Sequence, residues 1–332
     1  MPSPTPPTSQ PSPIGNILGK PQAPTVQPTK SKEQQLAELT AAAKAPPPAR
    51  SGAVMTNQQP PARPVPAKPA ASPSPGPTFG AIPTNQGLRV GIYGPGGIGK
   101  TTLAARAPGP VAFIDLDRSL PDLGKELEGL DIRNVQADTW PAVRAALALG
   151  PAWDPIKTIV IDSVSRLQEL ATEHMIQTVP HEKGNKVTKI EDYGYKSGYR
   201  NLLDLFMPVL QDLDAHVRAG RNVVLVLHEC TKLCPNPQGD DWLRYEPRLE
   251  DRDNCPIRYR VKEWLAHLLF IGYEVVVTKD QVGKGSGERR IYPCELPHCM
   301  AKSRSLGKLL PAGTTSFAFP DGSQNDFWGM LL

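Results

Sequence analysis

The segment from Gly94 to Thr102 brings together the residue types that bind phosphate. Its sequence, GPGGIGKTT, fits the spacing G-x-x-x-x-G-K-[ST] and lies between an apolar run and a helical stretch, the context this motif requires. Glycines let the backbone curl until its N–H groups point inward and form a nest for an anion. The predicted cradle consists of Gly94, Pro95, Gly96, Gly97, Ile98, Gly99, Lys100, Thr101 and Thr102.

The polar residues of this cradle have separate expected roles. Lys100 would reach the β- and γ-phosphates of a nucleotide, Thr101 would hold Mg²⁺ and Thr102 would contact the α-phosphate. Asp162 ends the apolar run TIVID some sixty residues later, where it would hold the same Mg²⁺ through water. The sequence therefore predicts a P-loop protein that binds ATP and Mg²⁺, with the metal at Thr101 and Asp162.

Two more acids follow the next apolar run. In AFIDLDRSL, Asp115 and Asp117 are two residues apart at a predicted strand end, which would place them on one face of the sheet. Ligands of open α/β folds bind outside the carboxyl ends of the strands, so both acids are expected to face the γ-phosphate. Hydrolysis requires such a carboxylate because Ser163, and not a second acid, follows Asp162.

Several P-loop classes share these motifs. GGIGKTTLA resembles the nucleotide-binding module of immune switches, which normally carry two acids at the second motif. It also resembles the partition ATPases, but Pro95 stands where those proteins have a signature lysine. Ring ATPases of the AAA+ type place a glutamate directly after the Mg²⁺ aspartate, so Ser163 argues against that class.

AFIDLD resembles the strand of the RecA family that ends in the catalytic glutamate. The resemblance implies that Asp117 activates the attacking water, with a shorter side chain than the family's glutamate. It also implies that His228, after NVVLVL, senses the γ-phosphate, and that Lys302 and Arg304 reach a neighbouring subunit's nucleotide. The similarity extends over roughly residues 88–317 and is greatest to small phage-encoded RecA-like ATPases of single-strand annealing and recombination systems.

The elements that must position these residues follow an α/β pattern. Nearly continuous apolar runs at 88–94, 111–116, 158–163 and 222–229 are typical of parallel strands covered by helices on both faces. Between the last two, apolar residues recur at helical spacing, and Gly220 is placed to end that helix. The segments 268–280 and 287–297 predict two antiparallel edge strands. We therefore expect a RecA-like fold, a mostly parallel sheet flanked by helices with antiparallel strands near the C-terminus.

Composition divides the chain into two parts. Residues 1–86 hold more than half of the 38 prolines, and we expect this tail to be disordered and available to a protein partner. Residues 87–332 form the predicted ATPase domain. The first 80 residues carry seven Lys/Arg against two Glu, so the remainder is nearly neutral and any nucleic-acid site must be local.

Neither a signal peptide nor a membrane-spanning run is recognisable, and we expect a cytoplasmic protein of a bacterium or a phage-infected host. Five cysteines, an odd number, suit reduced thiols. The spacing of Cys230, Cys234, Cys255 and His228 leaves zinc open, although the paired C-x2-C spacing of common structural sites is missing.

Two segments are candidates for binding single-stranded DNA. Residues 180–200 interleave five Lys/Arg with three tyrosines, as a surface for bases and phosphates requires. Residues 231–260 have aromatic residues but balanced charge, so a folded insertion is an equal alternative. The expected function is ATP hydrolysis on single-stranded DNA by a self-associating protein. A helicase-loader-like accessory, a small-molecule kinase and a nucleotide-dependent binding module remain alternatives.

Overall fold

The computed structural model describes residues 79–81, 83–277, 283–320 and 327–331, without the side chains of 275–277 and 283–286. The chain divides into two units, and the unit Thr78–Leu332 contains all the elements discussed below. The proline-rich tail predicted over residues 1–86 lies almost wholly outside the described residues.

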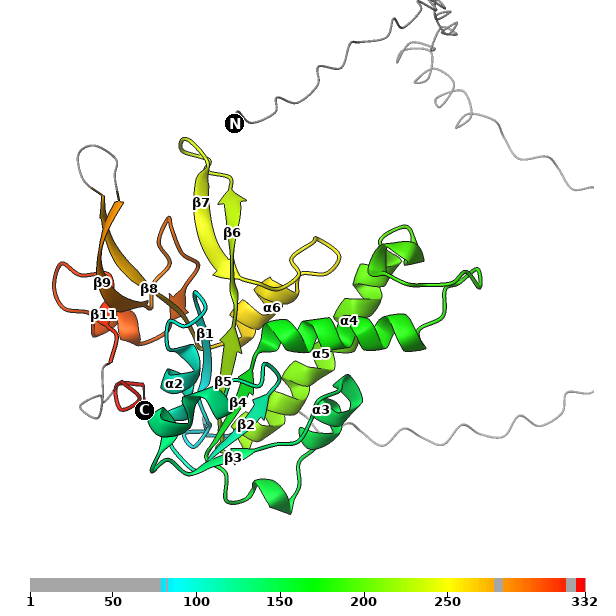
Figure 1. Ribbon diagram of the computed structural model, residues 1–332, viewed down its shortest axis with the longest axis horizontal. Helices are drawn as coiled ribbons and strands as arrows, with labels where there is room; N and C mark the ends of the chain where they lie inside the picture. Colours follow the sequence, from blue (N-terminus) through cyan, green and yellow to red (C-terminus); the bar gives the residue numbers. More distant parts are fainter. Residues whose placement is uncertain (1–78, 82, 278–282, 321–326, 332) are drawn as a thin grey trace, which may run out of the picture. The chain divides into compact units, whose positions relative to one another are not determined.

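The described part of the chain forms a nine-stranded, mostly parallel sheet in the order β11-β9-β8-β1-β5-β4-β2-β3, with β10 paired to β8 (Figure 1). The parallel strands that position the nucleotide motifs are β1 (Arg89–Tyr93), β2 (Val111–Asp115), β3 (Ile132–Asn134), β4 (Thr158–Asp162) and β5 (Asn222–Leu227). Buried Val, Ile and Leu side chains fill both faces of β4 and β5, which explains their continuous apolar sequence.

Helices cover both faces of the sheet (Figure 1). The longer ones are α3 (Trp140–Ala146), α4 (Val164–Thr178), α5 (Ser197–Arg218) and α6 (Ile257–Trp264), whose apolar residues belong to one core cluster. The other face packs against α2 (Lys100–Ala105) and the C-terminal residues Phe327, Trp328 and Leu331. Short 3-10 helices are η1 (Pro121–Leu127), η2 (Pro151–Trp153), η3 (Ile190–Tyr193) and η4 (Leu306–Lys308).

The mostly parallel α/β architecture with antiparallel strands near the C-terminus is confirmed, as is the end of α5. Gly220 has a φ of 85° and donates its N–H to the carbonyl of Val217, so it terminates the helix in the left-handed conformation.

The two predicted strands are antiparallel to each other, but the prediction that they lie at the edge of the sheet is wrong for both. β8 (His267–Val277) is an interior strand, parallel to β1 on one side and antiparallel to β9 (Gly283–Tyr292) on the other. Short strands β10 (Lys302–Ser303) and β11 (Phe317–Ala318) pair with β8 and β9. The long apolar run in β8 is explained by burial from Leu268 to Ile271 between β1 and β9.

Residues 231–260 form a folded insertion, as one of the two alternatives for this segment predicts. β6 (Glu229–Cys234) and β7 (Trp242–Pro247) form an antiparallel hairpin that extends from the end of β5 (Figure 1). Its base is fixed by Glu246, which is fully buried and accepts hydrogen bonds from Arg244 and Arg258.

The tyrosines of residues 180–200 do not share one environment. Tyr193 is buried and donates its hydroxyl to the carbonyls of Met175 and Val179. Tyr199 is also buried, where the guanidinium of Arg252 lies 4.0 Å from its ring. The expectation that all three tyrosines present a base-stacking surface is therefore wrong, because two of them build the local core.

Among the described residues, no helix has the length and apolar character needed to cross a membrane. All five cysteines are free thiols, and no three His, Cys, Asp or Glu side chains of the described residues come together as a metal site would require.

Candidate nucleotide-binding site

The predicted phosphate cradle lies at the carboxyl end of β1, at the sheet edge where β2, β4 and β5 also end. Gly94 has a φ of 154°, and a Cβ there would lie 2.1 Å from the carbonyl oxygen of Ile271. No other residue fits this position, because the loop must press against β8 to turn. The ammonium of Lys100 donates to the carbonyls of Gly94 and Pro95, each at 2.8 Å, and so crosses the loop.

Thr101 and Asp162 meet as the metal prediction requires. The Thr101 hydroxyl donates to a carboxylate oxygen of Asp162 at 2.5 Å. Burial raises the pKa of Asp162 to about 6, although the hydrogen bond from Thr101 opposes the shift. An oxygen-only pair with a buried carboxylate fits Mg²⁺, since a divalent cation would compensate a charge that burial disfavours.

The two acids after β2 have different partners. Asp115 accepts hydrogen bonds from the backbone N–H groups of Ser119 and Leu120 and from the Ser119 hydroxyl, so it fixes its own loop. Asp117 lies beyond the end of β2, and its N–H donates to the carbonyl of Asp162 at 3.2 Å. The strand alternation that would align the two carboxylates ends at Asp115, although the charges of both act on Asp162.

Asp117 and His228 are brought together from distant parts of the chain. The Nε2 atom of His228, directly after β5, lies 3.0 Å from a carboxylate oxygen of Asp117. Burial would raise the pKa of Asp117, but hydrogen bonds from His228 and Ser163 outweigh it and hold this pKa below the usual value. Asp117 is therefore a carboxylate at neutral pH, and a quarter of its side chain is exposed.

Lys100 is surrounded by acids at this edge. Burial lowers its pKa, while the charges of Glu229, Asp162 and Asp117 oppose that shift. Glu229 begins β6 and was not singled out by the sequence motifs, because its proximity to Lys100 follows only once β5 is placed beside β1.

Lys302 and Arg304 lie at the opposite end of the sheet from the cradle, since β10 pairs with the first residues of β8. The ammonium of Lys302 donates to the carbonyls of Lys262, Glu263 and Leu265 and so caps the carboxyl end of α6. Arg304 is exposed. Within one chain, neither cation approaches the phosphate cradle.

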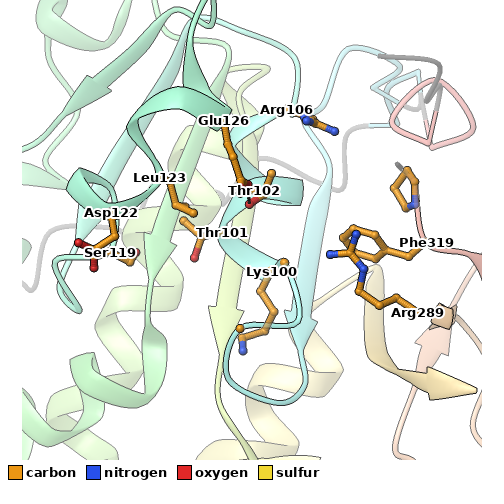
Figure 2. Close-up of a pocket in the computed structure, with 13 residues that line it drawn as sticks. Lys100, Thr101, Thr102, Arg106, Ser119, Asp122, Leu123, Glu126, Arg289 and Phe319 are labelled. Carbon is orange, nitrogen blue, oxygen red and sulfur yellow. Dashed lines mark hydrogen bonds between the residues drawn. The ribbon is translucent and has the colours of Figure 1, made fainter. Parts of the chain in front are cut away.

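A cavity of about 580 Å³ opens beside the cradle (Figure 2). Thr102 lines it and donates its hydroxyl to Glu126 at 3.0 Å. On the far side, the guanidinium of Arg289 lies 4.2 Å from the ring centroid of Phe319 and donates to the Ile98 carbonyl. Figure 2 shows both side chains facing the cradle from the opposite side to Ser119, Asp122 and Leu123.

The sequence did not predict that Arg289 and Phe319 line this cavity, because no short motif identifies residues that line a cavity. A Cβ on Gly99 would lie 2.9 Å from both side chains, so the requirement for glycine at that position was the one available signal. Asp117, Asp162 and His228 do not line this cavity, whereas Thr101, the hydrogen-bond partner of Asp162, does.

A phosphate cradle after the first parallel strand, a lysine inside it and a hydrogen bond between Thr101 of α2 and Asp162 at the end of β4 define a P-loop nucleotide-binding protein. The chain belongs to the AAA domain family, whose model matches residues 86–305. This family is one of P-loop ATPases, and the matched range contains the cradle, the four acids around it and Lys302–Arg304. A search of the curated proteins finds no match.

Ser163 stands at the position where ring ATPases of the AAA+ type have a glutamate, and it has a structural role in this chain. In the structure Ser163 accepts a hydrogen bond from the N–H of Arg166 and caps α4, so the position serves the helix.

Proposed function

We propose that the protein hydrolyses ATP with Mg²⁺, by in-line attack of water on the γ-phosphate. The cradle from Gly94 to Thr102 binds the phosphates through backbone N–H groups and Lys100. Asp117 accepts the proton of the attacking water, and His228 holds that carboxylate in place. The hydrogen bond between Asp117 and His228 is the observation that carries this proposal.

The position of this pair supports the roles assigned to it. Asp117 donates its N–H to Asp162, whose carboxylate accepts from Thr101. The water-activating carboxylate and the metal-binding pair are thus one backbone hydrogen bond apart. Because the pKa of Asp117 is held low, the group is deprotonated at neutral pH, which is the form that can accept a hydrogen bond from the attacking water.

Mg²⁺, bound by Thr101 and through water by Asp162, would supply positive charge to the β- and γ-phosphate oxygens. Lys100 must leave the carbonyls of Gly94 and Pro95 to contact those oxygens, and both carbonyls are within 2.8 Å of its present position. The same ammonium can therefore exchange loop carbonyls for phosphate oxygens within the cradle.

We further propose single-stranded DNA as the effector of this ATPase, bound by residues 180–200. Tyr195 is fully exposed, with a positive φ of 44° that turns it out of the fold. The basic residues of this segment are all exposed, namely Lys183, Lys186, Lys189, Lys196 and Arg200. One exposed ring among five cations fits a surface on which a base stacks and phosphates are neutralised.

The resemblance to RecA-like proteins of annealing and recombination systems supports the same assignment and suggests a role in those reactions. It also supports self-association, in which Arg304, and Lys302 if released from α6, would reach a neighbour's nucleotide. An exposed arginine at the far edge of the sheet is consistent with a contribution between subunits and excludes one within the subunit.

The experiment is steady-state ATP hydrolysis with and without a poly-dT oligonucleotide. Wild type is expected to hydrolyse ATP faster with the oligonucleotide, Lys100→Ala to be inactive, and Tyr195→Ala to lose stimulation while keeping the basal rate. Tyr259→Ala, an exposed tyrosine on α6, is the matched control. Basal hydrolysis that no oligonucleotide alters would refute the DNA assignment, and no hydrolysis at all would refute the ATPase.

A further inference from the structure

A second cavity, of about 440 Å³, lies among β7, β8 and β9 on the other side of the cradle from the first. It is bordered by the cradle residue Pro95 and by aromatic side chains of three strands and the segment after β9. The complete lining consists of Pro95, Tyr245, Phe270, Gly272, Tyr273, Tyr292 and His298.

The rings of this cavity form a continuous aromatic surface. Tyr245 stacks on Phe270 with centroids 5.1 Å apart and an interplanar angle of 16°. Phe270 contacts Tyr292 at 5.8 Å, and the ring of His298 meets Tyr292 edge-on at 5.2 Å. Tyr273 and Tyr245 remain about half exposed at the opening.

The surface is held rigidly from behind. The buried hydroxyl of Tyr93, the last residue of β1, lies 3.0 Å from the Tyr245 carbonyl and 2.6 Å from that of Met300. The Tyr245 N–H donates to the His298 carbonyl at 2.8 Å. These contacts fix β7 against the segment after β9, so the rings need no rearrangement to receive a ligand.

Local backbone features keep the cavity open. A Cβ on Gly272 would lie 2.7 Å from the Phe270 ring, so glycine is required where that ring turns across the strand. The pairing of β8 with β9 shifts register between Tyr273 and Val275. The regular pairing of the two strands therefore ends at Tyr273, which lines the cavity.

The lining selects for a flat, uncharged group. Aromatic faces favour a planar ring, while the phenol hydroxyls and His298 offer donors and acceptors to its edge. Burial lowers the pKa of His298, so its imidazole is neutral and can accept as well as donate. Among the residues whose side chains the structure describes, no carboxylate lines the cavity to balance a cationic ligand, and no lysine or arginine lines it to bind a phosphate.

We propose that this cavity, the aromatic pocket, binds a nucleobase by stacking against Tyr245 and Tyr273. The base can belong to single-stranded DNA or to a free nucleoside. Binding of a base of single-stranded DNA rests on the proposed function. A proline-rich peptide would also contact aromatic rings, but it needs an elongated groove for successive residues, whereas this lining surrounds one compact cavity.

Two measurements test the pocket, each with Tyr273→Ala, Tyr273→Phe and the matched surface control Tyr259→Ala. The first is fluorescence anisotropy of a labelled poly-dT oligonucleotide. The second is saturation-transfer NMR with thymidine in excess Mg–ADP, which keeps the phosphate cradle occupied. Loss of one stacked base should weaken oligonucleotide binding between about fivefold and a hundredfold in Tyr273→Ala. Tyr273→Phe and Tyr259→Ala should stay near wild type.

The outcomes separate the pocket from the DNA proposal. Thymidine binding that depends on Tyr273, without any oligonucleotide binding, supports the pocket with a free nucleoside and refutes the DNA assignment. Oligonucleotide binding that is equal in Tyr273→Ala and Tyr259→Ala overturns the pocket and leaves the DNA assignment standing. If neither the oligonucleotide nor thymidine binds, the proposal of a nucleobase pocket is overturned. It is also overturned if a decaproline peptide binds in a Tyr273-dependent way and neither of those ligands does.

Discussion

The substitution Glu246→Gln removes a buried negative charge that fixes the β6–β7 hairpin. Glu246 is fully buried between Arg244, whose Nε donates at 2.9 Å, and Arg258, which is itself 6% exposed on its side chain. Breaking one side of a buried ion pair usually costs about 3–5 kcal/mol. We expect a cost at the lower end of this range, about 3 kcal/mol, because each arginine retains another ion pair in the variant. Arg244 remains paired with Glu295 at 2.8 Å, and Arg258 with Asp251 at 2.9 Å.

Urea denaturation measured across pH checks this value. The paired arginines lower the pKa of Glu246 against the effect of burial, so its stabilisation is complete above the unfolded-state value of 4.5 and is lost as the pH falls through the folded-state value. The difference between wild type and Glu246→Gln should therefore be full at pH 7 and shrink below pH 4.5. Glu295→Gln, at a half-exposed position, should cost less than about 1 kcal/mol. Equal costs for the two variants would refute the assignment of a buried, hairpin-fixing charge.

Two further predictions concern the cradle and its cavity, and a third concerns a buried histidine at the opposite end of the sheet. Gly94→Ala should abolish nucleotide binding in equilibrium dialysis, because its Cβ would clash with the Ile271 carbonyl, whereas Gly96→Ala, with nothing within 4 Å, should bind normally. Arg289→Ala should weaken ATP binding about fivefold by removing one wall of the cavity, as measured by titration calorimetry. His267 has its pKa lowered from 6.5 to about 4 by burial and nearby cations, so folding stability should fall by on the order of 3 kcal/mol between pH 6.5 and 4, and His267→Gln should flatten that slope.

The cradle motif, the Thr101–Asp162 pair and the parallel sheet were predictable because each depends on local sequence. A short, continuous apolar run such as that of β4 is typical of a strand covered on both faces. Thr101 lies in the first turn of α2 and Asp162 ends β4, so both lie at the carboxyl edge of the sheet, where they meet. The helix end at Gly220 was predictable for the same local reason.

The features that the sequence could not predict depend on where each strand ends and on which strands pair with one another. Asp115 and Asp117 separate because β2 ends between them, and two residues of spacing do not reveal that end. The interior position of β8 follows from its pairing with β1, more than 170 residues earlier in the chain. Tyr193 packs against α4 and Tyr199 against Arg252. These contacts cannot be predicted from the number of basic and aromatic residues in the segment.

The central claim is that the Asp117 carboxylate activates the attacking water, and single-turnover ATP hydrolysis by Asp117→Asn tests it most directly. The variant keeps the shape of the side chain and should bind a slowly hydrolysed ATP analogue as wild type does, while hydrolysing ATP about 10²–10⁴-fold more slowly. Asp115→Asn, whose carboxylate only holds its own loop, should keep most of the activity. Near-normal hydrolysis by Asp117→Asn, with activity lost instead in Asp115→Asn, would contradict the account.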